Sequence, residues 1–426
     1  MSRNLLSIAL ATLLVTVAGV AARQVSSDAA LLARARAIHE RVFTVDSHVD
    51  ILGATYATAA LDPGKPTRLK CDLPKMKAGG MDGVFLAVYT GQRQDFTPAG
   101  YKAVYGEAID RFDAIDRLTA MHPELCELAR TPADAERIEK SGKRVILVGV
   151  ENGYPMGDDV ATLKTFYDRG TRYVTLVHGS HNQLADSSGD PQPRHNGLSG
   201  LGKKAVAEMN RLGIIVDTSH ASAKAFWDAI AVSKAPIMAS HSGCAALAKS
   251  DRNLDDDQLR ALAKNGGVIQ IVALGSYLKE DSPERAAAVR KLREELGRGR
   301  GGRGGRPAGE APAAPPPTPQ QQAEREKMYA LYQQRMEEID KEFPGATLKE
   351  FVDHIDHAVK VAGIDHVGVG TDFDGGGGVK GFNDHSEALN VTVELVRRGY
   401  SEDQIRKIWG GNLMRVWREV DRVAGK

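Results

Sequence analysis

The stretch that decides the fold class is VFTVDSHVD, residues 42–50. Its first half is a short apolar and β-branched run. Such runs recur along the chain, and segments of helical period lie between them. A doubly wound dinucleotide-binding sheet would place a glycine-rich fingerprint directly after its first strand. DSHVD stands there instead, so the sequence favours an α/β fold of the closed (β/α)8 TIM-barrel type.

Eight strands are predicted, and their near-continuous apolar runs are typical of parallel strands buried on both faces. They are Val42–Asp46, Gly83–Tyr89, Arg144–Val150, Tyr173–Val177, Ile214–Asp217, Pro236–Ser240, Gly267–Ala273 and His366–Gly370. The helical period of the segments between strands predicts helices. These are Ala103–Met121, Val160–Asp168, Leu201–Leu212, Ala223–Val232 and Asp255–Lys264.

Composition excludes several classes of protein. The 426 residues are 42% hydrophobic and 26% charged, which is ordinary globular usage. With 56 Lys and Arg against 55 Asp and Glu, the net charge is +1, so the basic excess of a nucleic-acid-binding protein is missing. Three cysteines form neither a disulfide scaffold nor a Cys-rich zinc site. Their odd number leaves at least one as a free thiol or paired between chains.

The first 22 residues read as a secretory signal peptide. Arg3 gives a positive start, Leu5–Val20 is uncharged and mostly apolar, and Ala21-Ala22 offers small residues for cleavage. The alternative is an uncleaved anchor, for which the run is short. We therefore expect a secreted or periplasmic protein without a stable membrane anchor, and residues 23–426 as a single barrel domain.

Residues 297–322 interrupt the strand–helix alternation. They read GRGRGGRGGRPAGEAPAAPPPTPQQQ and lie between the seventh and eighth predicted strands. An arginine- and glycine-rich segment is compatible with a polyanion-binding arm. Because it contains too little apolar surface to fold, we favour a disordered, solvated insertion. A polar helix is expected after it, from about Ala323 to Lys341.

Histidines and carboxylates gather where the predicted strands end. In a TIM barrel these carboxyl ends form the active-site face, so the side chains are expected to converge there. His48 and Asp50 are two residues apart on an extended backbone and therefore point the same way. The candidates in chain order are His48, Asp50, Glu151, His220, His241 and Asp372.

Five of these side chains exceed the ligand set of a single zinc ion and suit two metals roughly 3.5–4 Å apart. In this hypothesis Glu151 bridges the metals, His48 and Asp50 complete one site, and His220 and His241 complete the other. Two cations would make a bridging hydroxide available near neutral pH. Asp372 would accept the proton of the water and pass it to the leaving amine. Such ligands suit zinc but also admit manganese or cobalt.

Two further residues suggest how a substrate is bound. His178 follows the fourth predicted strand and is a candidate for polarising a carbonyl, with His181 as a rival. Arg252 offers a guanidinium fork for a substrate carboxylate. The alternative for Arg252 is a surface ion pair with one of the nearby aspartates.

The motifs that carry these residues resemble the membrane dipeptidase (renal dipeptidase) family, a branch of the amidohydrolase-like metal barrels. The resemblance runs from about Val45 to Trp417. The matching segments are DSHVD (46–50), GVENG (149–153), RYVTLVH (172–178), MNRLGIIVDTSHAS (209–222), PIMASHSG (236–243), DRNLDDDQL (251–259) and HVGVGTDFDGG (366–376).

The resemblance implies a dinuclear zinc enzyme that hydrolyses dipeptides. It places His48 and Asp50 on one zinc, Glu151 between the two, and His220 and His241 on the other. By the same likeness, His178 and Arg252 bind substrate, with Arg252 on its terminal carboxylate, and Asp372 handles the proton. Some members of the family accept a D-residue at the C-terminal position or open β-lactam rings. The last residues, WREVDRVAGK, are polar, so we do not expect the GPI tail of mammalian members.

Two other functions remain open on the sequence. One is a different hydrolase on the same site: an N-acyl amino acid deacylase, a lactonase or a phosphoesterase. The other is a binding protein that kept the barrel without catalysis. The expected partners are small dipeptides and no nucleic acid, and a homodimer is left open.

Overall fold

The computed structural model describes residues 28–51, 53–296 and 319–426. The predicted signal peptide (1–22) and most of the low-complexity insertion (297–318) lie outside the described residues. The last four residues of the predicted insertion, 319–322, begin helix α11 (Pro319–Glu342), so that boundary is corrected by four residues.

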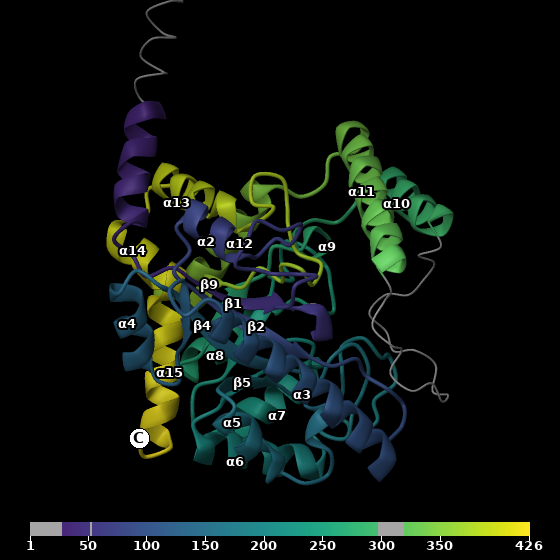
Figure 1. Ribbon diagram of the computed structural model, residues 1–426. Helices are drawn as coiled ribbons and strands as arrows, with labels where there is room; N and C mark the ends of the chain where they lie inside the picture. The colour runs from purple at the N-terminus through teal and green to yellow at the C-terminus, as the bar shows by residue number, and fades with distance from the viewer. Residues whose placement is uncertain (1–27, 52, 297–318) are drawn as a thin grey trace, which may run out of the picture.

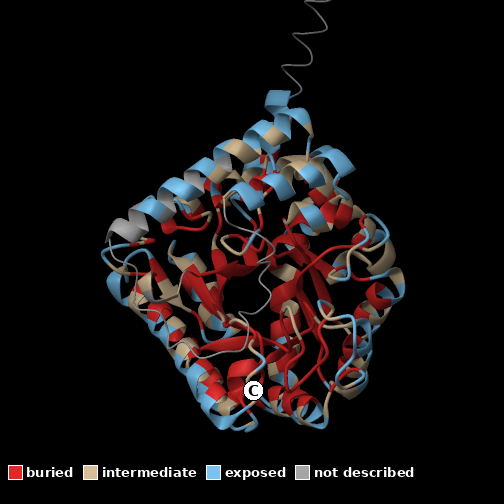
Figure 2. Ribbon diagram, turned by 90° about the vertical axis from the view of Figure 1, so that its right-hand side faces the viewer, coloured by how far each residue is buried: buried red, intermediate tan, exposed pale blue. Residues whose placement is uncertain are grey.

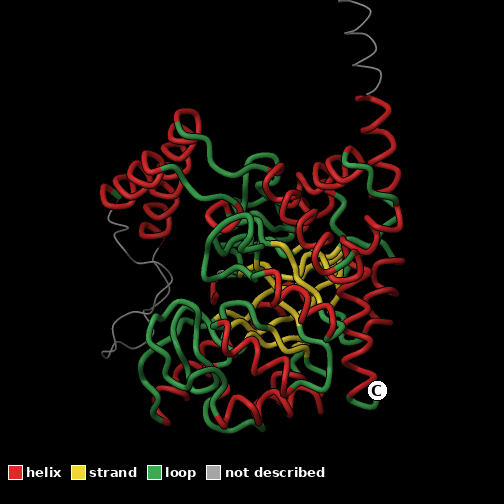
Figure 3. The backbone as a smooth tube through the Cα atoms, turned by 180° about the vertical axis from the view of Figure 1, so that it is seen from behind, coloured by secondary structure: helices red, strands yellow, loops and turns green. Residues whose placement is uncertain are grey.

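Eight parallel strands form the barrel, in the order β1-β2-β4-β5-β6-β7-β8-β9. A parallel bridge from Val49 to Phe373 joins the first strand to the chain after the last. In Figures 2 and 3 the strands lie at the centre and helices surround them. The strands are β1 (Val45–Asp50), β2 (Gly83–Tyr89), β4 (Arg144–Glu151), β5 (Thr171–Thr175), β6 (Ile215–Asp217), β7 (Met238–Ser242), β8 (Val268–Ile271) and β9 (Val367–Val369). The predicted fold class is confirmed.

Strand boundaries differ from the prediction where polar side chains continue a strand. The first strand is β1, so His48 and Asp50 lie within it and not beyond its end. Likewise β7 includes His241, because the polar residues of this strand have hydrogen-bond partners inside the barrel. A ninth strand, β3 (Cys126–Leu128), was not predicted: it pairs only with β4 and is too short to show a pattern.

Helices connect the strands and cover the outside of the barrel. All six predicted helices are present, the polar one as α11, and Ala223–Val232 is matched at both ends. Residues 28–39 are also helical. The helices are α2 (Leu73–Gly79), α3 (Pro98–Met121), α4 (Pro132–Lys140), α5 (Thr162–Asp168), α6 (Gly200–Leu212), α7 (Ala223–Val232), α8 (Asp256–Lys264), α9 (Gly275–Leu278), α10 (Pro283–Glu295), α11 (Pro319–Glu342), α12 (Leu348–Ala362), α13 (Ala388–Arg397), α14 (Glu402–Arg406) and α15 (Asn412–Val423).

Helices α10 and α11 stand apart from the ring of helices and pack against each other (Figure 1). Arg285 of α10 joins the pair by an ion pair of 2.5 Å to Asp340 of α11. Among the described helices, every one is too short or too polar to cross a lipid bilayer. The three cysteines, Cys71, Cys126 and Cys244, are buried free thiols.

Candidate metal centre

Glu151, the last residue of β4, is the centre of the site. Its side chain is fully buried, and four histidine rings reach it with their Nε2 atoms. His48 Nε2 lies 3.6 Å from Oε2, and the other three approach Oε1. Those distances are 3.1 Å for His220, 3.5 Å for His178 and 3.5 Å for His241.

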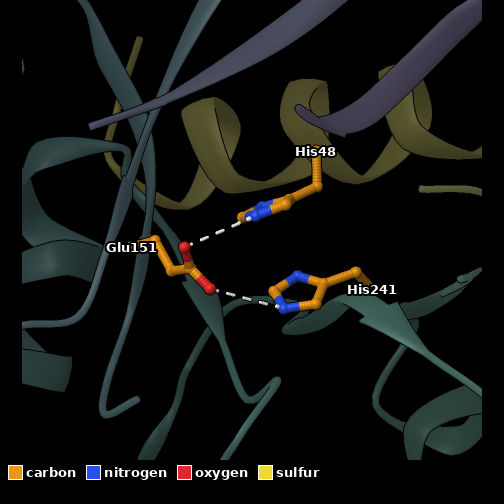
Figure 4. A group of neighbouring side chains, drawn as sticks. All are labelled: His48, Glu151 and His241. Atoms are coloured by element: carbon orange, nitrogen blue, oxygen red, sulfur yellow. Dashed lines mark ion pairs between the residues drawn. The ribbon is translucent and has the colours of Figure 1, made fainter. Parts of the chain in front are cut away.

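The four histidines come from four different parts of the barrel. His48 and His241 lie in β1 and β7, and their rings are neighbours, with centroids 3.9 Å apart, that both face Glu151 (Figure 4). His178 and His220 each follow a strand by three residues, after β5 and β6. His220 has a φ of +68°, a conformation that is uncommon for a residue with a side chain and costs free energy. Such strain is typical of functional sites, where surrounding contacts hold the residue in place.

Two groups of possible metal ligands share Glu151. One is His48, Glu151 and His241; the other is Glu151, His178 and His220. A shared carboxylate is what the sequence predicted for Glu151. The histidines are divided differently, however, because His241 lies with His48 and His178 joins His220. The predicted pair nevertheless also meets, since the Nε2 atoms of His220 and His241 are 2.9 Å apart.

Asp50 and Asp372 lie at the edge of this cluster. Asp50 Oδ1 is 3.6 Å from His48 Nε2, and Asp372 Oδ1 is 4.0 Å from the same atom. The backbone of Asp372 donates a hydrogen bond to the carbonyl oxygen of His48. All six residues predicted at the strand ends therefore converge.

Burial and local charge set the ionisation of these groups. Burial lowers the pKa of His220 and His241 well below the ordinary histidine value, and neighbouring positive groups lower it further. Burial opposes a charge on His48 as well, but Glu151 and Asp50 outweigh it and raise its pKa. Burial would raise the pKa of Glu151, but His48 and His178 lower it well below its usual range. Neutral His220 and His241 beside an ionised Glu151 have the protonation states that metal binding requires, whereas His48 would give up a proton when a metal binds.

The donor set fits divalent metal ions. Within the described residues, His48 Nε2 and both carboxylate oxygens of Glu151 are buried and make no hydrogen bond. Buried polar atoms are normally satisfied, so these atoms are suited to a bound ion. The close approach of two imidazole Nε2 atoms suits a bound ion as well, because both can direct lone pairs at one cation.

A cavity of about 260 Å³ opens beside the histidines. Arg252 lies on its wall, its guanidinium donating to the carbonyl oxygen of His241 at 3.3 Å and lying 5.4 Å from the ring centre of Tyr277. The predicted substrate residues His178, Arg252 and Asp372 all line this cavity. The full lining is His178, Gly179, Gly189, His220, His241, Arg252, Leu274, Tyr277, Asp372 and Gly375.

His181, the rival of His178, is placed differently. Its Nδ1 accepts a hydrogen bond from the backbone N–H of Ser187, and its Nε2 lies 2.6 Å from the carbonyl oxygen of Gln192. With both ring nitrogens used by the backbone of its own loop, His181 is positioned to order that loop. The geometry therefore favours His178 as the residue that meets substrate.

Sequence reasoning missed several residues around the site. Leu274 and Tyr277 follow β8 and form part of the cavity wall. Their position just beyond the end of a strand could have indicated this role. The ring of Tyr89, at the end of β2, lies 4.8 Å from that of His178. Tyr173 contacts His48, with its hydroxyl 2.8 Å from Nδ1. No sequence signal indicated that contact, since the two residues are 125 positions apart.

The chain is similar to known dipeptidases over most of its length. The profile of the membrane dipeptidase family (peptidase family M19) matches residues 32–426. Dipeptidase tcpJ of Claviceps purpurea is 32% identical over 366 residues, 85% of this chain and 72% of the relative. Dipeptidase verJ of Clonostachys rogersoniana is 30% identical over 83% of this chain and 77% of the relative. The crystal structure of the probable dipeptidase PvdM from Pseudomonas aeruginosa is 34% identical, with a TM-score of 0.77 over 92% of this chain and 99% of that one.

Proposed function

Because this chain belongs to the membrane dipeptidase family and is a metal-dependent dipeptidase, we propose that it works with two zinc ions shared by Glu151. The observation that carries this proposal is the position of Glu151, whose carboxylate belongs to both groups of histidines. Divalent cations held there would supply Lewis acidity, polarising water and the scissile carbonyl.

The residues of the chain have separate tasks in this proposal. His48, Asp50, His220 and His241 hold the metals together with Glu151. Arg252, on the cavity wall, binds the carboxylate of a dipeptide, because a guanidinium pairs with a carboxylate through two parallel hydrogen bonds. This contact would select dipeptides over longer peptides, since only a dipeptide places its terminal carboxylate one residue from the scissile bond.

His178 and Asp372 act on the reacting groups. His178 faces the cavity and would hold the carbonyl oxygen as it gains negative charge. Asp372 would take a proton from the attacking water and give it to the amine that leaves. Both residues lie within reach of the same centre, since His178 is 3.5 Å from Glu151 and Asp372 is 4.0 Å from His48.

We also propose that the enzyme accepts a D-residue at the C-terminal position. Glycines make up three of the residues that line the cavity, Gly179, Gly189 and Gly375. No side chain narrows the cavity at these three positions, which favours room for either configuration of the substrate's last residue.

The test combines metal analysis with a substrate panel. Protein purified without chelator should contain about two zinc ions per chain, and should hydrolyse dipeptides with L- or D-residues in the last position. N-acyl amino acids and lactones in the same panel distinguish the other hydrolases. Preference for those compounds, with no turnover of any dipeptide after zinc is restored, would contradict the proposal.

A further inference from the structure

Asp217 is a buried carboxylate that the proposed reaction does not use. It is the last residue of β6 and is 0% exposed. Its carboxylate receives four hydrogen bonds. Oδ1 accepts from the backbone N–H groups of Ser219 (3.1 Å) and Ser240 (2.8 Å). Oδ2 accepts from the hydroxyls of Thr175 (2.5 Å) and Ser240 (2.6 Å).

This arrangement determines where the hydroxyl hydrogen of Ser240 goes. A carboxylate surrounded by donors acts only as an acceptor. Ser240 has one hydroxyl hydrogen, and Asp217 Oδ2 lies 2.6 Å away in line to receive it. The other possible acceptors are Ser219 Oγ at 3.4 Å and the ring nitrogen His241 Nδ1 at 2.8 Å, and an ionised carboxylate is a stronger acceptor than either of these neutral groups. The hydrogen is directed at Asp217.

Ser240 Oγ is also 2.8 Å from Nδ1 of His241. Because its own hydrogen is given to Asp217, the oxygen can only accept here, and Nδ1 of His241 must carry the donated hydrogen. In a neutral imidazole the other nitrogen is then bare. That atom, Nε2, is the one that faces Glu151 at 3.5 Å and His220 at 2.9 Å.

We propose that Asp217 and Ser240 are positioning residues that hold His241 in the tautomer able to bind metal through Nε2. The inference rests on the proposed role of His241 as a metal ligand. Partners of this kind orient ligating histidines in metal proteins, and their loss costs roughly 10- to 100-fold in metal affinity. In this chain the carboxylate acts through an intervening hydroxyl.

The chain offers a matched control for this proposal. Thr175 and Ser240 each donate one hydroxyl hydrogen to Asp217 Oδ2, and both are buried. Ser240 also contacts His241, whereas the Thr175 hydroxyl contacts Asp217. Ser240→Ala and Thr175→Val therefore remove the same kind of bond to the carboxylate, but only the first removes the acceptor for His241.

Zinc affinity of the full chain, stripped of metal and titrated against a competing chelator, measures the difference. We expect Ser240→Ala to lose roughly 10- to 100-fold in affinity and Thr175→Val to stay close to the parent. Ser240→Thr, which keeps the hydroxyl, should bind zinc like the parent. Equal affinities for Ser240→Ala and Thr175→Val, or a loss in Ser240→Thr as large as that in Ser240→Ala, would overturn the proposal.

A second measurement leaves Asp217 and Ser240 unchanged. In metal-free protein labelled with ¹⁵N-histidine, long-range ¹H–¹⁵N spectra distinguish the two tautomers, and the signal lost in His241→Asn identifies the residue. We expect His241 to be protonated at Nδ1, and protonation at Nε2 would overturn the inference even if the variants fold poorly. Failure of the parent chain to bind zinc would contradict the proposed function, while this spectrum would still decide the tautomer.

Discussion

Asp372 combines a left-handed backbone with a position on the cavity wall. Its φ is +58°, and its side chain lies beside His48. Asp and Asn are the residues with side chains that best tolerate this conformation. Substitution by Asn therefore changes the chemistry of the group while leaving the backbone unstrained, which makes it the informative variant.

Asp372→Asn should lose turnover and keep its metal. An amide cannot accept and return a proton, and proton transfer by a positioned side chain is worth roughly 10²- to 10⁴-fold in rate. Dipeptide kinetics and metal analysis of the same preparation measure both effects. A variant that loses its metal together with its activity would show that Asp372 is a ligand.

Arg252→Ala should weaken binding of substrates that have a free terminal carboxylate. The lost charge-assisted hydrogen bonds predict an increase in KM of about 10- to 100-fold. Dipeptide amides are the matched substrates, because they lack the carboxylate and should be affected much less. The same increase for free and amidated dipeptides would place Arg252 outside carboxylate recognition.

Between elements, a glycine in β4 makes room for a tyrosine of β5. Gly149 and Tyr173 are paired in register, and a Cβ atom at Gly149 would overlap the ring of Tyr173. The ring instead extends across the barrel so that its hydroxyl meets His48 Nδ1. Gly149 of β4 thus leaves room for Tyr173 of β5, whose hydroxyl contacts His48 of β1.

Gly149→Ala and Gly106→Ala should change stability in opposite directions. At Gly149 the added methyl group meets the Tyr173 ring, which should cost about 1–3 kcal/mol. Gly106 is an exposed residue inside α3 with open space around it, so alanine should stabilise the protein by about 0.5–1 kcal/mol. Chemical denaturation of both variants gives the two values. Destabilisation of similar size at both sites would refute this packing argument.

Helix α12 is joined to the active-site face through His354. Its Nδ1 accepts the backbone N–H of Cys244, after β7, and its Nε2 donates to the carbonyl oxygen of Leu278 in α9. Burial lowers the pKa of His354 to about 4. Below the ordinary histidine pKa, the unfolded chain takes up a proton that the folded chain resists, so this residue lowers stability as the pH falls towards 4.

His354→Asn should reduce the loss of stability in acid. Asparagine does not titrate, and its side-chain oxygen can replace Nδ1 as an acceptor. The lowered pKa corresponds to about 3 kcal/mol between neutral pH and pH 4. Unfolding free energies of parent and variant at several pH values test this. Parallel pH profiles would show that His354 does not titrate on unfolding.

At the scale of the whole molecule, the metal centre joins distant parts of the barrel. Glu151 of β4 meets histidines of β1 and β7 and of the loops after β5 and β6. Metal ions bound by these residues would stabilise the folded chain, since the unfolded chain does not assemble the site.

Removal of metal should lower the melting temperature. At a free metal concentration of 100 times Kd, binding to the folded state alone contributes about 2.7 kcal/mol. Thermal unfolding before and after chelation, and again after zinc is restored, measures this contribution. An unchanged melting temperature, with metal loss verified by analysis, would show that the centre does not support the fold.

Much of the fold and of the candidate site was predictable from local sequence patterns. Apolar runs alternating with helical segments predict the barrel, and the rule that parallel strands end at one face predicts that His48, Glu151 and His220 meet. Strand ends were less certain, because a polar residue such as His241 continues a strand only when a partner inside the barrel satisfies it. The hydrogen bonds that link Asp217 to Ser240 and Ser240 to His241 were not predicted either, since nothing local distinguishes these residues from ordinary strand-end polar groups.

By itself, the sequence determined the fold class, and it predicted which histidines and carboxylates converge on one face of the barrel. These follow from periodicity and from the order of residues along each strand, which are local properties. Only the tertiary structure decided which histidines are neighbours. It also decided that both ring nitrogens of His181 contact the backbone of its own loop, and that the hydroxyl of Tyr173 contacts His48. Those outcomes depend on contacts between residues far apart in the chain, and such contacts exist only once the strands have closed into a barrel.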